Sequence, residues 1–373
     1  MKMPTRTLLL LLSLSSVATG FTTSYQQSAV HLVARSILQS TKSLASDSSA
    51  AAGATTATIP VNDKQNTDIA DIVKSVNYFI SRKCNYSCQF CFHTQKTSHA
   101  LTLAQASIGL RLLQQAGTRK INFAGGEPFL HPELLGELCR LASAELGLAV
   151  SIISNGSLIT QEWMDTYGRY VDVLGVSVDS FVDATNMAIG RGETTATTSS
   201  STAPKRQNRH VDRVLRVRDM CYKHDIIFKL NTVVCSLNWD ENMIEQVRLL
   251  NPQRWKVFQV LLLDDENVGR PDQLRDARPL VVSDAQFEAF CARHQPAMPS
   301  GVLIPEPNSV MQNSYLLLDE DMRFLDCSQG GKVPGESILK VGVAKALSQA
   351  GFDHAMFQQR GGEYNWKRER PRP

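Results

Sequence analysis

The sequence alternates apolar, strand-like segments with helix-like segments, and this alternation limits the fold more than any other feature. Strands that alternate with helices of about 10 to 15 residues form βα units and a parallel sheet. About six units are present, fewer than the eight that close a full barrel, so an open barrel is predicted. The predicted strands are Val76–Ile80, Lys120–Phe123, Ala149–Ser154, Val173–Val178, Ile226–Val233 and Arg254–Leu262, and the predicted helices are Leu101–Ala116, Pro132–Glu145, Gln161–Tyr170, Val211–His224 and Asn242–Leu250.

The alternation stops at Leu263, and the pattern beyond it is different. Pro, Asp and Arg residues accumulate there, and shorter apolar segments follow, including Tyr315–Leu318 and Met322–Leu325. We therefore predict an α/β fold, a partial (βα)6 TIM-like barrel over residues 68–263. A C-terminal cap over residues 264–373 is expected to cover the open side of the sheet and to contribute to the ligand site.

Residues 1–67 lack the alternation and are predicted to precede the folded part. Basic residues come before a short apolar run, Leu8–Leu12, and no acidic residue occurs before Asp47. Three interpretations stay open: a secretory signal with a disordered linker, a bipartite organelle-targeting sequence, or a membrane-surface anchor in which Val30–Leu38 forms an amphipathic helix. Within the barrel, the Thr/Ser tract at residues 193–204 has no periodicity and predicts a disordered surface insertion.

Lysines inside predicted strands indicate a site for an anion. The formal net charge of +3 is small for 373 residues, so a polybasic nucleic-acid binder is not expected and any anion needs a local cluster of cations. Lys120 and Asn122 share one face of their strand, as do Lys229 and Asn231, while Lys256 lies within the sixth strand. Buried lysines are costly unless they meet an anion, and three around one cavity suit a triphosphate. Strand ends or solvent-facing edges are the alternative explanation.

Three of the eight cysteines, Cys84, Cys88 and Cys91, crowd into the segment CNYSCQFC directly after the first predicted strand. Thiolates are soft ligands that bind zinc or iron–sulfur clusters. A closed structural zinc site needs four ligands, and His93 is the only close candidate for the fourth. Three thiolates on a four-iron cluster would leave one iron open to a reactive ligand. A structural zinc loop stays the alternative.

A second motif, FAGGEP, follows the second predicted strand. The glycines Gly125 and Gly126 let the backbone approach a ligand closely, and Glu127 offers a carboxylate to an ammonium group. Active sites of barrel-like sheets gather at the carboxyl ends of the strands, although turn residues and helix caps also occur there. Polar residues end the third and fourth predicted strands: Ser154, Asn155 and Ser177.

The CxxxCxxC spacing, with Phe90 before the third cysteine and GGEP one βα unit later, resembles the radical S-adenosylmethionine superfamily. In that superfamily three cysteines bind three irons of a [4Fe-4S] cluster, and the fourth iron binds S-adenosylmethionine. One electron from the cluster then releases a 5′-deoxyadenosyl radical. The resemblance implies that Cys84, Cys88 and Cys91 bind the cluster. It also implies cofactor binding by Gly125, Gly126, Glu127, Ser154, Asn155 and Ser177.

Further blocks narrow the resemblance to the viperin-like enzymes of this superfamily. They cover roughly residues 71–366 and include KINFAGGEPFL, SIISNGSLI, IGRG, FKLN, NPQRWKVFQ, SYLLLDEDMRFLDC and RGGEY. Viperin-like enzymes convert CTP to 3′-deoxy-3′,4′-didehydro-CTP, an antiviral chain terminator. The radical removes the ribose 4′ hydrogen, and the 3′ hydroxyl leaves as water. Tyr315 matches a tyrosine near the substrate and is the implied proton donor. The other implied substrate contacts are Asn85, Lys120, Arg191, Lys229, Asn231, Lys256 and Lys332.

The resemblance also implies a location and partners. These are the cytosolic face of the endoplasmic reticulum membrane, an electron donor and iron–sulfur assembly factors, with no direct nucleic acid. Three departures bear on this: Ala124 replaces the usual serine before GGEP, the Thr/Ser tract directly follows IGRG, and the sequence ends in KRERPRP instead of a tryptophan used for cluster delivery. The last departure favours a plastid or mitochondrion. Two other functions stay open: a radical enzyme for another nucleotide, and a membrane-associated interaction protein with a structural cluster.

Overall fold

The computed structural model describes residues 69–192, 210–268 and 273–368. All of these belong to one compact unit that begins at Asn66. The predictions for the leader, including the amphipathic helix at Val30–Leu38, and for the Thr/Ser tract at 193–204 lie outside the described residues. Among the described residues, no helix has both the length and the apolar composition needed to cross a membrane.

The described strands form one sheet of ten in the order β10-β9-β8-β1-β2-β3-β4-β5-β6-β7. Strands β1 to β7 pair in parallel in chain order, and β8 pairs in parallel with the free side of β1. The sheet is not closed, so the predicted partial barrel is confirmed. The strands are β1 Ser75–Phe79, β2 Lys120–Ala124, β3 Ala149–Ser154, β4 Val173–Ser177, β5 Ile227–Val234, β6 Arg254–Gln259, β7 Leu303–Glu306, β8 Leu316–Leu318, β9 Arg323–Asp326 and β10 Val333–Ser337.

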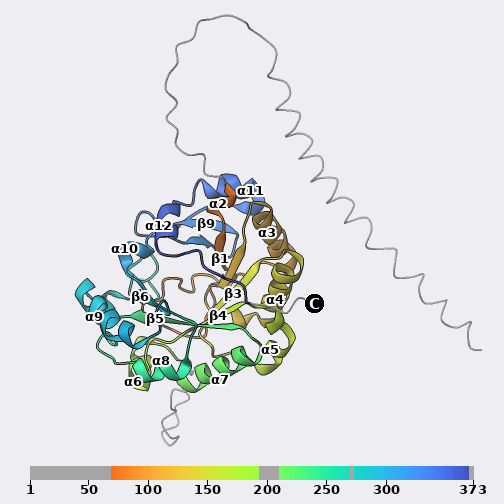
Figure 1. Cartoon of the computed structure of the whole chain (residues 1–373). Coiled ribbons are helices and arrows are strands. Elements are labelled where there is room, and N and C mark those ends of the chain that lie inside the picture. Colours follow the sequence, from red (N-terminus) through yellow and green to blue (C-terminus); the bar gives the residue numbers. More distant parts are fainter. Residues whose placement is uncertain (1–68, 193–209, 269–272, 369–373) are drawn as a thin grey trace, which may run out of the picture. The chain divides into compact units, whose positions relative to one another are not determined.

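Helices surround the outside of the strands, with α3, α4, α5, α7 and α8 following the sheet in chain order (Figure 1). The start of α3 is fixed by a capping box in which Thr102 and Gln105 bond each other's backbone. The helices are α2 Ile69–Ile72, α3 Leu103–Gln115, α4 Pro132–Arg140, α5 Gln161–Tyr167, α6 Asp183–Ile189, α7 His210–Lys223, α8 Ile244–Leu250, α9 Asp284–His294, α10 Asn308–Met311, α11 Ile338–Leu347 and α12 His354–Gln359.

The core lies between the strands and these helices. Every residue of β2 is buried, as expected for a parallel strand that is covered on both faces. Phe123, Phe228 and Trp255 are fully buried, and the indole nitrogen of Trp255 donates to Thr232 Oγ1 over 2.9 Å. The apolar outward face of each strand therefore anchors the barrel, while the inward face is free to carry polar residues.

Most element boundaries agree with the predictions within two residues, and the differences have local causes. The predicted helix Pro132–Glu145 ends its α-helical part at Arg140 and continues as a π-helical turn, Leu141–Glu145. The predicted strand Arg254–Leu262 ends at Gln259, where its partner strand β5 also ends at Val234; the last contact between them is the hydrogen bond from the Val260 N–H to the Val234 carbonyl.

The segment 264–373 does more than cover the sheet. Its strand β7 extends the sheet beside β6, and its strand β8 extends the opposite side beside β1. The predicted short apolar segments are β8 and β9, which form an antiparallel pair. The two ends of the partial barrel are therefore built by residues that lie late in the chain.

Candidate active site

The three clustered cysteines lie on one loop that follows β1. The thiols of Cys84, Cys88 and Cys91 are free and partly exposed. Cys91 donates its backbone N–H to the Cys88 carbonyl over 3.1 Å, and Tyr86 donates to Cys84 Sγ over 3.4 Å. Burial raises the pKa of Cys84 to about 12 and of Cys88 to about 11, so both thiols keep their protons until a metal replaces them.

The GGEP motif holds the start of this cysteine loop by backbone contacts. Gly126 donates its N–H to the Ser81 carbonyl and Glu127 donates to the Lys83 carbonyl, both over 2.8 Å. Gly125 has a φ of +137°, and a Cβ on Gly126 would lie 2.1 Å from the Lys83 oxygen. Both glycines are thus required by the close approach of this protein's own backbone. Their predicted role in cofactor binding stays a prediction.

The Glu127 carboxylate joins the carboxyl ends of β2 and β3. It accepts hydrogen bonds from Ser154 Oγ at 2.8 Å, from the Asn155 N–H at 2.7 Å and from the Phe129 N–H at 3.1 Å. Burial raises its pKa to about 7. Three predicted cofactor-binding residues therefore form one bonded group beside the cysteine loop.

Asn85, between the first two cysteines, extends this group. Asn155 Nδ2 donates to Asn85 Oδ1, and Asn85 Nδ2 donates to Ser157 Oγ, each over 2.9 Å. Ser177 ends β4, where its carbonyl oxygen lies 3.0 Å from His210 Nε2. The polar residues predicted at the strand ends are therefore at the same edge of the sheet as the cysteines.

The middle of the cysteine loop rests on the end of α6. The N–H groups of Ser87 and Gln89 donate to the Gly190 and Ile189 carbonyls over 3.1 and 2.9 Å. Gly190 has a φ of +83°, and a Cβ there would lie 2.4 Å from the Ser87 oxygen. The next residue, Arg191, is buried and forms an ion pair with Asp179. The structure therefore places Arg191 beside the cysteine loop.

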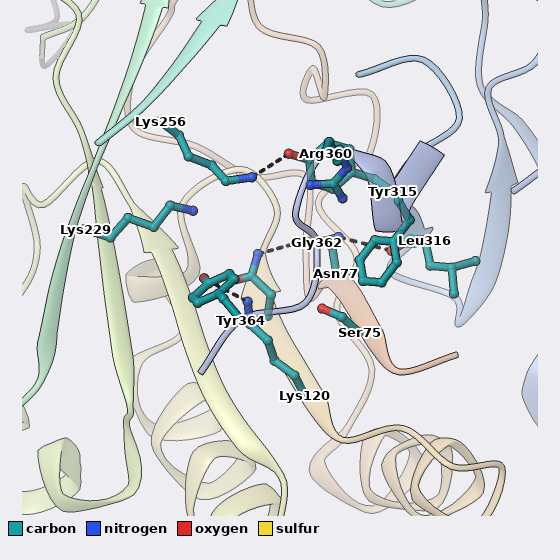
Figure 2. A pocket seen from close by; sticks show the side chains of 12 residues that line it. Ser75, Asn77, Lys120, Lys229, Lys256, Tyr315, Leu316, Arg360, Gly362 and Tyr364 are labelled. Carbon is teal, nitrogen blue, oxygen red and sulfur yellow. Dashed lines mark hydrogen bonds between the residues drawn. The ribbon is translucent and has the colours of Figure 1, made fainter. Parts of the chain in front are cut away.

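A second polar group lies inside the barrel, where three strand lysines surround a cavity of about 40 Å³. Lys120 of β2, Lys229 of β5 and Lys256 of β6 are each less than a tenth exposed. Figure 2 shows the amino groups of Lys229 and Lys256 pointing into the same space. The three lysines line one cavity, as the sequence predicts. The cavity is lined by Ser75, Asn77, Lys120, Asn122, Lys229, Lys256, Tyr315, Leu316, Phe357, Arg360, Gly362 and Tyr364.

Burial and neighbouring cations disfavour the charged forms of all three lysines. Burial, together with Arg254 and Arg360, lowers the pKa of Lys120 to about 7. Burial and the same two arginines outweigh the opposite effect of Glu306 and lower the pKa of Lys256 to about 8. Burial, followed by the charges of Lys256 and Lys120, lowers the pKa of Lys229 well below its usual value. Within the described residues, Lys229 Nζ has no hydrogen bond or ion pair. An anion in the cavity would supply the missing partner.

One carboxylate balances part of this charge. Glu306 of β7 is fully buried, forms an ion pair with Lys256 and accepts the hydrogen bond of the Tyr315 hydroxyl. Lys256 Nζ donates to the same hydroxyl over 2.9 Å, and the Arg360 guanidinium lies 3.7 Å from the centre of the Tyr315 ring. Tyr315 therefore links a proton donor to a proton acceptor at the cavity wall.

The segment after α12 closes the cavity. The rings of Tyr364 and Trp366 lie 5.2 and 5.4 Å from Lys120 Nζ, and the Arg254 guanidinium lies 4.2 Å from the Tyr364 ring. The remaining space holds only a few water molecules, so a nucleotide enters only if this segment moves. No role for Arg254, Glu306, Arg360 or Tyr364 is predicted from the sequence, although the blocks RGGEY and NPQRWKVFQ contain three of them.

Four predicted substrate residues do not line this cavity: Asn85 and Arg191, described above, and Lys332 and Asn231. Lys332 is buried with Nζ 3.7 Å from Glu266 and 3.1 Å from His93 Nδ1, next to the cysteine loop. Asn231 lies opposite Lys256 in the β5–β6 pairing, and its Oδ1 is buried without a hydrogen bond. Arg191 and Lys332 are therefore near the cluster side, and Lys120, Lys229, Lys256 and Tyr315 line the interior cavity.

Comparison with known proteins defines the class. The Radical SAM superfamily model matches residues 78–250. Two solved structures have the same fold at 14% identity: native anSMEcpe with bound AdoMet and Kp18Cys peptide, with a TM-score of 0.54 over 78% of this chain and 86% of that chain, and Streptococcus suis SuiB bound to S-adenosylmethionine, with a TM-score of 0.52 over 78% and 67%. The open barrel and its three-cysteine loop are thus those of a radical SAM protein.

Curated relatives narrow the class. The S-adenosylmethionine-dependent nucleotide dehydratase RSAD2 of Siniperca chuatsi is 47% identical over 322 residues, covering 85% of this chain and 86% of the relative. The Danio rerio RSAD2 is 48% identical over 297 residues, covering 79% and 78%. A dehydratase from a Thermoplasmatales archaeon is 34% identical over 70% of this chain and 86% of its own length. The chain belongs to this viperin-like family of radical SAM nucleotide dehydratases.

Membership confirms the predicted cofactors, because radical SAM enzymes use a [4Fe-4S] cluster and S-adenosylmethionine. The residues present fit this group: one loop supplies three free, partly exposed thiols, and the bonded polar group around Glu127 lies beside them. Among the described residues, no three His, Cys, Asp or Glu side chains are placed to hold a single metal ion.

The GGEP contacts generate a first prediction. In Gly126→Ala the new Cβ meets the Lys83 carbonyl at 2.1 Å, which forces the start of the cysteine loop to move. We expect a loss of about 1–3 kcal/mol in unfolding free energy and less iron bound per chain after anaerobic reconstitution. Gly168→Ala is the matched control, since its Cβ would make ordinary contacts at 3.5 Å. Equal iron content in the two variants would contradict the proposed contact.

The lysine cavity generates a second prediction. The unfolded chain protonates Lys229 below pH 10.5, whereas the folded protein does so only at much lower pH, so this lysine lowers folded stability at neutral pH. Lys229→Met should stabilise the protein without nucleotide by roughly 1 kcal/mol or more at pH 7. The gain should shrink as the pH rises toward 10.5. Denaturant unfolding at several pH values measures this, with exposed Lys340→Met as control; a Lys229→Met protein less stable than the parent would refute it.

Proposed function

We propose that this protein converts CTP to 3′-deoxy-3′,4′-didehydro-CTP. The observation that carries the proposal is the convergence of Lys120, Lys229 and Lys256 on one interior cavity, with Lys229 lacking any partner among the described residues. Ammonium groups fixed around one space match the charges of a triphosphate. The relatives named nucleotide dehydratases support the reaction type, and the choice of cytosine follows from the resemblance to viperin-like enzymes.

In this proposal the triphosphate replaces the electrostatic repulsion among the lysines with ion pairs. Binding an anion raises the pKa of each lysine, so Lys120 and Lys256 become fully charged at neutral pH when the nucleotide is present. Much of the binding free energy then comes from relieving an unfavourable state of the empty cavity. The polyphosphate fixes the nucleotide, and the ribose extends toward the strand ends that carry the cysteine loop.

The residues that would hold the cofactors lie at that edge. Cys84, Cys88 and Cys91 would hold the cluster, and Glu127 with its partners Ser154 and Asn155 would hold S-adenosylmethionine. When bound, the cluster and S-adenosylmethionine supply the one-electron chemistry that removes the ribose 4′ hydrogen. The 3′ hydroxyl leaves as water, and one electron from the electron donor and one proton complete the product.

Tyr315 is the proposed source of a proton. Burial and the adjacent Glu306 raise its pKa well above its usual value, so the hydroxyl keeps its proton at neutral pH. Lys256 donates to the Tyr315 oxygen over 2.9 Å and can return a proton after transfer. Tyr364 and Trp366 cover this side of the cavity, and their rings exclude water during the reaction.

A substrate comparison tests the proposal. Reconstituted protein is incubated anaerobically with S-adenosylmethionine, dithionite and one nucleoside triphosphate, and deoxyadenosine and nucleotide products are measured. CTP should stimulate deoxyadenosine formation more than ATP, GTP or UTP do and should yield the didehydro product. Lys229→Ala should raise KM for CTP by roughly tenfold or more and leave uncoupled deoxyadenosine formation unchanged. Equal stimulation by all four nucleotides would remove the CTP assignment.

We further propose that residues 1–67 bind the protein to the cytosolic face of the endoplasmic reticulum membrane. The basic residues, the short apolar run and the segment Val30–Leu38 support this. An electron donor and iron–sulfur assembly factors would be its partners, and the product would serve antiviral defence. A fluorescent fusion of residues 1–67 should label the endoplasmic reticulum; labelling of plastids or mitochondria would contradict it.

A further inference from the structure

The turn at residues 264–268, which follows β6, contacts both ends of the cysteine loop. Glu266 in this turn is 2% exposed. Its Oε1 lies 2.9 Å from Arg82 Nη1, and its Oε2 accepts hydrogen bonds from the Thr94 N–H at 2.9 Å and from Thr94 Oγ1 at 2.8 Å. Arg82 precedes Cys84 by two residues, and Thr94 follows Cys91 by three. One carboxylate therefore joins the start of the loop to its end.

Two further bonds strengthen this junction. Arg82 Nη1 also donates to the Thr94 carbonyl over 3.1 Å, so the two ends contact each other directly. The neighbouring Asn267 donates from Nδ2 to the Phe90 carbonyl inside the loop at 3.3 Å and to the Leu261 carbonyl at 2.9 Å. The same turn thus contacts the loop at two places. One is the neck of the loop, where Arg82 and Thr94 meet, and the other is Phe90, just before the third cysteine.

The other supports of the loop differ in kind. The GGEP segment and the end of α6 hold it through hydrogen bonds between backbone groups. The neck depends on side chains that are about 170 to 180 residues apart from it in sequence. Arg82 is also bonded to Glu320 over 3.1 Å, and Lys332 lies 3.7 Å from Glu266. Charged groups so well buried persist only when all of them are paired.

We propose that Glu266 is a positioning residue for the iron–sulfur cluster. By closing the neck of the cysteine loop, it fixes the spacing of Cys84, Cys88 and Cys91 and slows the release of the cluster. The inference rests on the cluster that the family uses and is independent of which nucleotide is the substrate. Burial raises the pKa of Glu266, but the charges of Lys332 and Arg82 and the hydrogen bonds from Thr94 and Arg82 together lower it more, so the carboxylate is charged at neutral pH.

Glu266→Gln tests this role because it keeps the shape of the side chain and removes its charge. The amide can serve the Thr94 groups or Arg82 with an oxygen, but its nitrogen repels the remaining donors. Thr94→Val is a milder variant that removes the hydroxyl bond and keeps the backbone N–H. Asp172→Asn is the matched control: Asp172 is also buried, accepts the Val150 N–H over 2.9 Å and lies at the opposite end of the sheet.

The measurement is the rate at which a chelator removes iron from anaerobically reconstituted protein, taken at a temperature where circular dichroism shows every variant folded. Glu266→Gln should lose its cluster roughly tenfold faster than the parent, Thr94→Val at an intermediate rate, and Asp172→Asn at the parental rate. The electron paramagnetic resonance spectrum of the reduced cluster should change in Glu266→Gln alone. Parental rates in both Glu266→Gln and Thr94→Val, or equal acceleration in Asp172→Asn, would overturn the proposal.

Discussion

Burying a lysine side chain raises the free energy of the folded protein unless a counter-ion or hydrogen bonds offset the lost hydration, and the interior of this barrel holds three buried lysines near one another, of which Lys229 has no partner among the described residues. Glu306 balances only Lys256, and it shares its charge with Arg360. The apolar packing between the strands and the outer helices has to offset the remaining cost. The ligand site therefore lowers the stability of the empty protein, and a polyanion that pairs with the lysines would remove this cost.

At the edge of the barrel that carries the cysteines, the structural requirement is different. A loop without regular secondary structure must keep three thiols in fixed positions. Glycines at positions 125, 126 and 190 allow other backbone segments to approach the loop closely. Side chains of the turn after β6 close its neck. Since Lys332 contacts Glu266, the segment that follows β9 is connected electrostatically to the cysteine loop.

The features that could be predicted from the sequence are those that depend on neighbouring residues in the chain. Six strands could be recognised from apolar runs, and the convergence of Lys120, Lys229 and Lys256 follows from side-chain alternation along strands that pair in order. The position of Lys332 beside His93, and the use of Glu127 by Ser154 and Asn155, depend on contacts between distant segments. Arg360 and Tyr364 were in a recognised block, but nothing in the sequence says that they face Lys120 and Tyr315.

The cavity walls come from residues as far apart in the chain as Ser75 and Tyr364. Translation therefore delivers the three strand lysines well before it delivers Tyr315, Arg360 and Tyr364. The closed cavity therefore cannot form before the last of these residues has been made, and an incomplete chain has the three lysines without the side chains that cover them.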